Sequence, residues 1–289
     1  MTSTTAVNQP PAPATSDLRI WVNGTLFTDP ESATIGAADH GLVVGDGVFE
    51  TLKVLPAGPF TVGRHLDRLT RSARLLGLPD PDHEQLREGI DAVLRDRGYE
   101  HGKIRITYTG GRGPLGSQPA FGPPTVVVAA DASPPMESST AIVTAPWTRN
   151  ERGALAGVKS ISYAENVRAL AYAAERGATE AILINNAGQV CEGTGSNIFF
   201  IFGDEIITPT LESGPLAGIT RALVLEWCGG READLTEDEA RRADEVFITS
   251  SLRDVQHVHR WGDQEFATGV KTAAAAKIFA DRSTAALEA

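Results

Sequence analysis

Short strand-like and helix-like segments alternate along the whole chain of 289 residues, and this mixture limits the possible folds more than any other feature. Apolar residues at a helical period predict helices, whereas alternating or continuous apolar runs between turn residues predict strands. Helices are expected over residues 63–76, 83–97, 162–175, 218–227, 237–243 and 270–287. Strands are expected over residues 18–22, 25–27, 48–54, 103–109, 125–130, 141–145, 180–184, 189–191, 197–202, 205–208, 244–249 and 255–261. Because both kinds of segment occur in both halves, the sequence predicts an α+β fold.

One break in this pattern divides the chain. Ser133-Pro134-Pro135 interrupts the periodic segments in the way that linkers do, just after the strand at residues 125–130, whose Val and Ala residues predict that it is buried. We expect a small N-terminal α/β domain over residues 17–132, a linker over residues 133–139 and a larger C-terminal domain over residues 140–289. Residues 1–16, rich in Thr, Pro and Ala, are typical of a disordered arm.

Charge and cysteine content exclude several classes of protein. The net charge of −11 argues against a nucleic-acid binder, because such a protein needs a basic face that displaces counterions. The two cysteines, Cys191 and Cys228, cannot build a disulfide framework, which indicates a reducing cytoplasm. No apolar run reaches the length of a membrane span. The composition therefore predicts a cytoplasmic protein that binds neither nucleic acid nor a membrane, and it leaves room for a pocket that binds a small anion.

Lys159 is the first candidate for chemistry. It has small and apolar neighbours, with no acidic residue until Glu165, in a chain that has 21 Arg but only 5 Lys. Apolar surroundings disfavour the charged amine, so the pKa falls and a neutral nucleophile becomes available. Such amines form Schiff bases with carbonyl compounds such as pyridoxal phosphate. The alternative is a surface lysine whose ammonium group reaches water from a strand edge.

Three further segments could hold a phosphorylated cofactor. The helix that begins near Gly218 would present unpaired backbone N–H groups and the Thr220 hydroxyl to a phosphate, although an ordinary capped helix would look the same. Ser250 and Ser251 follow a strand and could add further donors. Glu192 precedes a turn of small residues, where its carboxylate could hold a protonated pyridine nitrogen or simply face water.

Other patterns carry less weight. The G-x-G-x-x-G sequence from Gly111 to Gly116 follows a strand, but the prolines after it prevent the helix that a dinucleotide site requires. His257 and His259 lie on one strand face without a third ligand nearby, so no metal site is predicted. Arg68 lies off the leucine stripe of its helix, and the helical period alone places it on a solvated face.

Taken together, six blocks of the chain resemble the class IV, or fold-type IV, pyridoxal-phosphate enzymes. This family includes branched-chain and D-amino-acid aminotransferases and 4-amino-4-deoxychorismate lyase. The blocks occur in the order of the family between about Ile20 and Ser251. They are Asp39–Thr51, His65–Leu69, Lys159, Glu192–Asn197, Gly218–Arg221 and Ala243–Ser251.

The resemblance implies pyridoxal phosphate as the cofactor, a pseudo-barrel-like C-terminal domain and a homodimer with the site between the domains. It implies that Lys159 forms the Schiff base and acts as the base, and that Glu192 pairs with the pyridine nitrogen. Tyr163 would contact the phenolic oxygen of the cofactor. The phosphate would be held by Arg68, Ile219, Thr220, Ser250 and Ser251.

The resemblance narrowly favours the lyase, which releases pyruvate and forms 4-aminobenzoate. Thr51 resembles a threonine that is credited with proton transfer in the lyases, and the Lys159, Tyr163 and Asn166 spacing also resembles them. The substrate would lie beside Arg105, Tyr108 and Arg112. An amino-acid aminotransferase is the alternative, and a cofactor-binding protein without turnover is a remote one.

Overall fold

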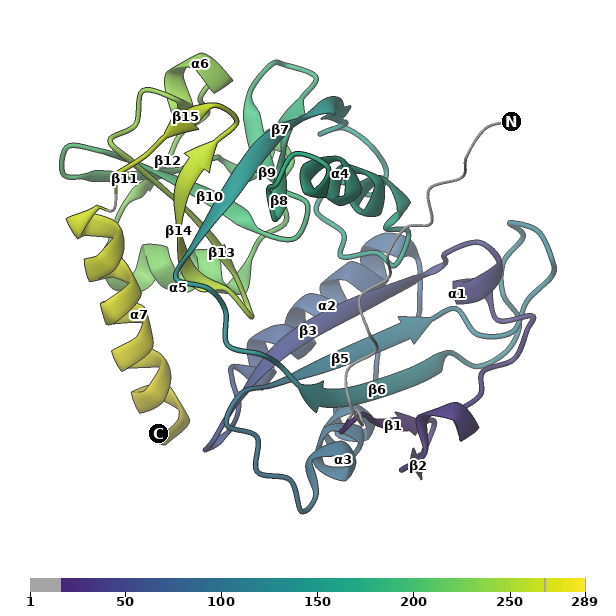
Figure 1. Cartoon of the computed structure of the whole chain (residues 1–289). Helices are drawn as coiled ribbons and strands as arrows, with labels where there is room; N and C mark the ends of the chain where they lie inside the picture. The colour runs from purple at the N-terminus through teal and green to yellow at the C-terminus, as the bar shows by residue number, and fades with distance from the viewer. Residues whose placement is uncertain (1–16, 268, 289) are drawn as a thin grey trace, which may run out of the picture.

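The computed structural model describes residues 17–267 and 269–288, which form two sheets with helices packed on them (Figure 1). The predicted disordered arm, residues 1–16, lies outside the described residues. Each helix and strand expected from the sequence is present, with shifted ends. The elements that the sequence did not reveal are single helical turns and strands of two residues.

The first sheet has six strands in the order β2-β1-β6-β5-β3-β4, and every neighbouring pair is antiparallel. Its strands are β1 Arg19–Val22, β2 Thr25–Phe27, β3 Gly47–Leu55, β4 Gly58–Pro59, β5 Gly102–Thr109 and β6 Thr125–Ala132. The helical elements of this half are η1 Pro30–Ser32, α1 His40–Val43, α2 Val62–Leu76 and α3 His83–Leu94. Leucines of α2 and α3 pack on the valines and isoleucines of one sheet face and form a buried core.

Two expectations for this half were wrong. The helix predicted over residues 83–97 ends at Leu94, because Arg95 is extended and its carbonyl accepts a hydrogen bond from the Arg19 guanidinium. The strand predicted to be buried, now β6, buries only the face with Val126 and Val128. Its other face is half-buried, and a run of apolar residues cannot show which side of a strand is covered.

The second sheet has nine strands in the order β12-β11-β10-β13-β14-β7-β8-β9, with β15 paired to β14. Its strands are β7 Ser139–Arg149, β8 Glu180–Asn185, β9 Val190–Gly193, β10 Asn197–Phe202, β11 Glu205–Thr208, β12 Arg231–Glu232, β13 Glu245–Ser250, β14 Asp254–Trp261 and β15 Gln264–Glu265. The helical elements are α4 Ala164–Ala174, η2 Leu211–Ser213, α5 Ile219–Cys228, α6 Glu237–Ala240 and α7 Val270–Glu288. β7 begins inside the predicted linker, residues 133–139.

This second sheet is curled. β9 and β10 are joined by residues 194–196, although four other strands separate them in the sheet order. Neighbouring strands lie about 4.8 Å apart, so a flat sheet would place β9 and β10 beyond the reach of that turn. The sheet therefore bends back on itself and encloses its own core of buried isoleucines, Phe200 and Trp261, in agreement with the predicted pseudo-barrel.

Backbone hydrogen bonds join the two halves. The Phe49 N–H donates to the Lys159 carbonyl at 2.9 Å, and the Ile161 N–H donates to the Gly47 carbonyl at 2.9 Å. Residues 159–161 thus act as a short extra strand on the free edge of β3. Two ion pairs, Lys53 with Asp254 at 2.6 Å and Arg64 with Glu226 at 2.7 Å, link the same halves.

A buried ionic cluster lies under β3. Glu50 is fully buried and accepts hydrogen bonds at 2.7 Å from Nε and Nη2 of Arg68, and its Oε2 lies 2.7 Å from Nδ1 of His65. Burial by itself would raise the pKa of Glu50, but the charge of Arg68 and these hydrogen bonds outweigh it and lower the pKa to about 2. The placement of Arg68 on a solvated face was wrong, because α2 turns this residue toward β3 and leaves it 7% exposed.

Glu50→Ala should lower the free energy of unfolding by about 3–5 kcal/mol at neutral pH, because Arg68 then stays buried without its counter-charge. Urea unfolding followed by circular dichroism measures this difference. The lowered pKa of Glu50 means that its carboxylate stabilises the folded protein fully at a pH above 4.5, the ordinary pKa of a glutamate. This stabilisation is lost as the pH falls toward about 2. The difference between wild type and variant should narrow over that range.

The control is Asp80→Ala, which removes the exposed partner of Arg74. Exposed ion pairs contribute little, so this variant should unfold much like the wild type. Equal losses in both variants would contradict a special role of the buried cluster.

Candidate active site

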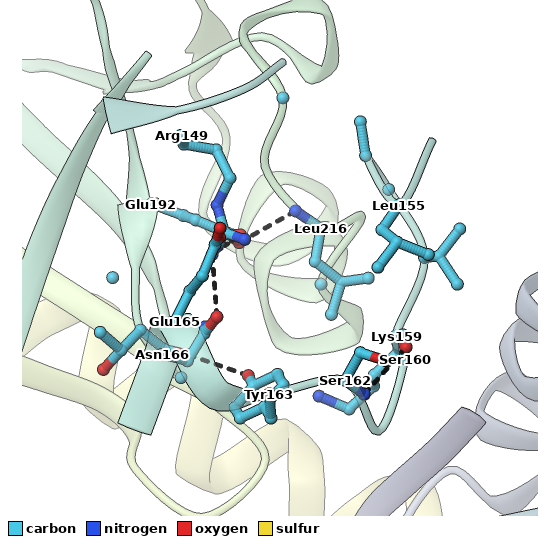
Figure 2. Close-up of a pocket in the computed structure, with 18 of the residues that line it drawn as sticks. Arg149, Leu155, Lys159, Ser160, Ser162, Tyr163, Glu165, Asn166, Glu192 and Leu216 are labelled. Carbon is cyan, nitrogen blue, oxygen red and sulfur yellow. Dashed lines mark hydrogen bonds and ion pairs between the residues drawn. The ribbon is translucent and has the colours of Figure 1, made fainter. Parts of the chain in front are cut away.

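A cavity of about 750 Å³ lies where the two halves meet. Figure 2 shows side chains from residues 149–166, Glu192 from β9 and Leu216 from the segment before α5 around it. Eight residues predicted to bind the cofactor line this cavity together: Arg68, Lys159, Tyr163, Glu192, Ile219, Thr220, Ser250 and Ser251. Residues that are far apart in the sequence therefore form one site.

Lys159 is half-buried at this cavity, and its position follows from the pairing of its backbone with β3. Its Nζ lies 4.3 Å from the centre of the Phe49 ring, whose face attracts a cation. Burial lowers the pKa of Lys159 to about 8, while Glu50 and Glu192 act in the opposite direction. A lysine in this state supplies a neutral amine near neutral pH, as nucleophilic chemistry requires.

Glu192, on β9, also faces the cavity. Its Oε2 accepts a hydrogen bond from the Leu216 N–H at 2.9 Å, and its Oε1 lies 3.6 Å from Nη2 of Arg149 (Figure 2). Burial raises the pKa of Glu192, whereas Arg149, the Leu216 N–H and Lys159 oppose that rise. The carboxylate is held at both oxygens and is poised to face a proton-bearing group in the cavity.

The turn after Glu192 is fixed from two sides. Its Thr194 carbonyl accepts hydrogen bonds from the Tyr163 hydroxyl at 2.9 Å and from the Asn166 side-chain amide. On the other side, buried Glu180 accepts hydrogen bonds from the Thr194 N–H at 2.8 Å, from the Thr194 hydroxyl and from the Ser196 hydroxyl at 2.9 Å. The contacts from Asn166 and Glu180 are buried, and a satisfied buried network of this kind makes the turn rigid.

The part of the cavity beside the start of α5 is suited to bind an anion. α5 begins there after Gly218, and no side chain among the described residues caps it, so its first N–H groups point into the cavity with the positive end of the helix dipole. A Cβ at Gly218 would overlap the Asn197 side chain, which explains the glycine. The buried Thr249 hydroxyl, beside Ser250, has no hydrogen-bond partner in the described part of the chain.

Comparisons with known proteins identify the family. Residues 47–261 match the sequence profile of the family described as amino-transferase class IV. This chain belongs to that family. Class IV aminotransferases depend on pyridoxal phosphate, and the chain is accordingly an enzyme of this kind.

Two curated relatives of this class IV aminotransferase carry aminotransferase names. A putative branched-chain-amino-acid aminotransferase of Methanocaldococcus jannaschii is 34% identical, over 82% of this chain and 86% of the relative. A D-alanine aminotransferase of Bacillus licheniformis is 31% identical, over 87% of this chain and 91% of the relative.

Solved structures share the fold over nearly the whole chain. A hypothetical aminotransferase from Mycobacterium tuberculosis in a PLP-bound form has a TM-score of 0.82 at 26% identity, over 93% of this chain and 98% of that one. A putative 4-amino-4-deoxychorismate lyase from Legionella pneumophila has a TM-score of 0.82 at 27% identity, over 88% and 97%. The family resemblance and the fold type expected from the sequence are confirmed.

The side chains of the cavity fit pyridoxal phosphate. The start of α5, the unpaired Thr249 hydroxyl and the two N–H groups of Arg68 not used by Glu50 or Ala217 suit the phosphate. Lys159 suits the aldehyde and Glu192 suits the ring nitrogen. The bound cofactor supplies an electron sink for carbanionic chemistry at the substrate, whereas binding, orientation and proton transfer fall to the protein.

Tyr163 lines the cavity, and its hydroxyl donates to the Thr194 carbonyl. Its contact with the phenolic oxygen of the cofactor stays a prediction. Burial raises the pKa of Tyr163 to about 12. The residue lines the cavity in its neutral form and braces the turn after Glu192.

Four predicted residues do not line this cavity. Arg105 comes nearest, because its Cζ lies 3.9 Å from the centre of the Phe49 ring that Lys159 also faces. Thr51 pairs with Arg105 across β3 and β5, one pleat beyond Phe49. Arg112 lies on the loop after β5, and its backbone bridges Asp39.

The expectation that Tyr108 contacts the substrate was wrong for this cavity. Its side chain is 3% exposed in the core of the first sheet, and its hydroxyl donates to the Pro79 carbonyl at 3.2 Å. The side chains of successive residues on a strand point to opposite faces, so Tyr108 points away from the face with Arg105.

Sequence reasoning missed three acidic or basic residues that support the site. Glu50 holds Arg68, Glu180 holds the turn after Glu192, and Arg149 contacts Glu192. Glu50 interrupts an apolar strand and Glu180 begins one, which could have marked them as buried charges with partners. Arg149 has no such signal, because only the path of β7 brings it to Glu192.

Among the described residues, no helix is long and apolar enough to cross a membrane. Nor does the described part of the chain contain a cluster of side chains that could bind a metal ion.

Lys159→Ala should abolish covalent attachment of pyridoxal phosphate. After reduction with borohydride, the wild type should gain the mass of one pyridoxyl phosphate per chain, whereas the variant should gain none. Lys277→Ala, on the exposed face of α7, is the matched control and should be labelled like the wild type. An adduct that persists in Lys159→Ala would assign the role to another lysine.

The rate at which the apo-protein takes up pyridoxal phosphate should depend on pH. The neutral amine attacks the aldehyde, and its fraction rises as the pH passes the pKa of Lys159, about 8. Stopped-flow absorbance should show a rate that increases up to this pH and then levels off. A rate still rising toward pH 10.5, the ordinary value for lysine, would contradict the lowered pKa.

Proposed function

We propose that this protein is an amino-acid aminotransferase, which moves the amino group of an amino acid to a 2-oxo acid. Two observations support the proposal. Lys159 and Glu192 line the same cavity, and the two relatives above carry aminotransferase names. In this function Lys159 would anchor the cofactor and afterwards move a proton between the two carbon atoms that flank the amino nitrogen. A positioned amine with a pKa of about 8 suits that work, because it both accepts and returns a proton near neutral pH.

The position of Thr51 favours transfer over lysis. In the lyase, Thr51 would help to protonate the leaving group, but this residue does not line the cavity. The Tyr163 hydroxyl donates to the Thr194 carbonyl, whereas the Lys159 amine lines the cavity. A reaction in which one amine moves the proton fits this arrangement better than a reaction that needs two donors.

The position of Arg105 favours a substrate that carries a carboxylate. Its guanidinium carbon lies 3.9 Å from the centre of the Phe49 ring, which the Lys159 amine also approaches to 4.3 Å, and it pairs with no carboxylate of the described residues. An arginine of this kind can bind the carboxylate of an amino acid or a 2-oxo acid with two hydrogen bonds. We therefore assign substrate binding to Arg105, and we keep Arg112 as a second candidate on its loop.

The lyase is the second candidate. The likeness to the putative lyase of Legionella pneumophila and the spacing of Lys159, Tyr163 and Asn166 favour it. The division into domains at residues 133–139, the homodimer and the cytoplasmic location stay predictions.

Purified holoenzyme should be supplied with branched-chain amino acids or D-alanine together with 2-oxoglutarate, and separately with aminodeoxychorismate. Formation of the new amino acid and the new 2-oxo acid, measured by mass spectrometry, is the expected result. Pyruvate and 4-aminobenzoate from aminodeoxychorismate would support the lyase instead. Neither set of products, from protein that carries the lysine-bound cofactor, would support a binding protein without turnover.

Arg105→Met should raise KM for the amino-acid substrate about tenfold or more, because a hydrogen bond to a charged group contributes about 1.5–3 kcal/mol. Lys103→Met is the matched control, since Lys103 lies two residues away on β5 and points to the same face. An unchanged KM in Arg105→Met would show that the carboxylate of the substrate binds to other residues.

A further inference from the structure

Arg149 has no place in the roles assigned so far, although it is the charged residue in contact with Glu192. It is the last residue of β7, and its side chain is 20% exposed, against 13% for Glu192. Its Nη2 lies 3.6 Å from Oε1 of Glu192 and donates to Oδ1 of Asn166 at 3.3 Å. Its Nε is buried and has no hydrogen-bond partner in the described part of the chain.

Asn166 fixes the direction of this guanidinium. Its side-chain oxygen accepts the hydrogen bond from Arg149, and its side-chain amide donates to the Thr194 carbonyl. Thr194 belongs to the turn that follows Glu192, and its N–H donates to the Glu180 carboxylate. Arg149 is thereby tied, through one amide side chain, to the segment that carries the carboxylate it contacts (Figure 2).

This geometry has a direct electrostatic consequence. A carboxylate and a pyridine nitrogen that face each other share one proton, and its position depends on which of them binds it more strongly. Burial increases the proton affinity of Glu192, and buried Glu180 on β8 acts in the same direction. Arg149 from β7, the Leu216 N–H and Lys159 act against it. Of these opposing groups Arg149 has the strongest effect, and it keeps its charge at every relevant pH.

We propose that Arg149, oriented by Asn166, is a positioning residue that keeps Glu192 as a carboxylate and so leaves the shared proton on the ring nitrogen of the cofactor. The inference rests on the proposed role of Glu192 and deepens it. Without the guanidinium, the buried carboxylate would take the proton, and the neutral ring would withdraw electrons less strongly. Arg149 would then influence the chemistry through Glu192.

The direct test is the protonation state of the ring nitrogen in protein loaded with ¹⁵N-labelled pyridoxal phosphate. The nitrogen chemical shift distinguishes the protonated from the neutral ring and does not depend on turnover. We expect a protonated ring in the wild type and a shift toward the neutral ring in Arg149→Met. Arg149→Lys should restore much of the wild-type signal, because it returns the charge. Transfer activity of Arg149→Met should fall about 10–100-fold, as is typical when an outer partner of a site is removed.

Arg152→Met is the matched control, since this arginine lies three residues along the chain, is 90% exposed and contacts Glu151 rather than Glu192. It should keep the wild-type shift. Asn166→Ala provides a second route if Arg149→Met does not fold, because it removes the tether and leaves the charge. It should give an intermediate shift.

A wild-type nitrogen shift in both Arg149→Met and Asn166→Ala would overturn the proposal. Glu192→Gln separates that failure from a failure of the proposed role of Glu192. If Glu192→Gln also leaves the ring protonated, Glu192 is not its partner and the underlying assignment is wrong. If only Glu192→Gln changes the shift, Glu192 keeps its role and Arg149 serves the packing of β7 against α4.

Discussion

The site depends on the pairing of residues 159–161 with the free edge of β3. Two backbone hydrogen bonds fix Lys159, which comes from the second half of the chain, against a strand of the first half. Backbone pairing of this kind sets the position of a side chain more strictly than side-chain contacts do, because it fixes several dihedral angles at once. The amine on which the chemistry depends is therefore placed by the docking of the two halves.

β3 uses its two faces for two different tasks. Phe49 points to one face, where its ring lies under the Lys159 amine and the Arg105 guanidinium. Glu50 points to the other face and holds Arg68 at the end of the cavity that suits a phosphate. A shift of one residue in the register of β3 would exchange these faces and destroy both arrangements. The antiparallel pairing with β5 over the full length of the strand prevents that shift.

The electrostatics of the cavity move the pKa values of its two central groups toward each other. Burial lowers the pKa of Lys159 and raises the pKa of Glu192, whereas each group opposes the shift of the other. The lowered pKa of Lys159 makes its neutral amine available for proton transfer on an amino acid, whereas Arg149 and the Leu216 N–H act to keep Glu192 ionised. The pKa of Glu50 is lowered instead, because Arg68 and His65 keep its carboxylate ionised. Glu50 therefore stabilises the structure.

The sequence by itself determined the longer helices and strands, the family and eight of the residues that line the cavity, because hydrophobic periodicity is local and the blocks of the family are contiguous. The spacing of Lys159, Tyr163 and Asn166 was also visible, yet only the structure showed that the last two donate to one carbonyl, that of Thr194. Tertiary structure alone decided that Arg68 is buried, that Tyr108 faces a core and that Arg149 reaches Glu192. Burial, strand faces and contacts between distant strands depend on how the two sheets pack, and that packing is a property of the whole chain.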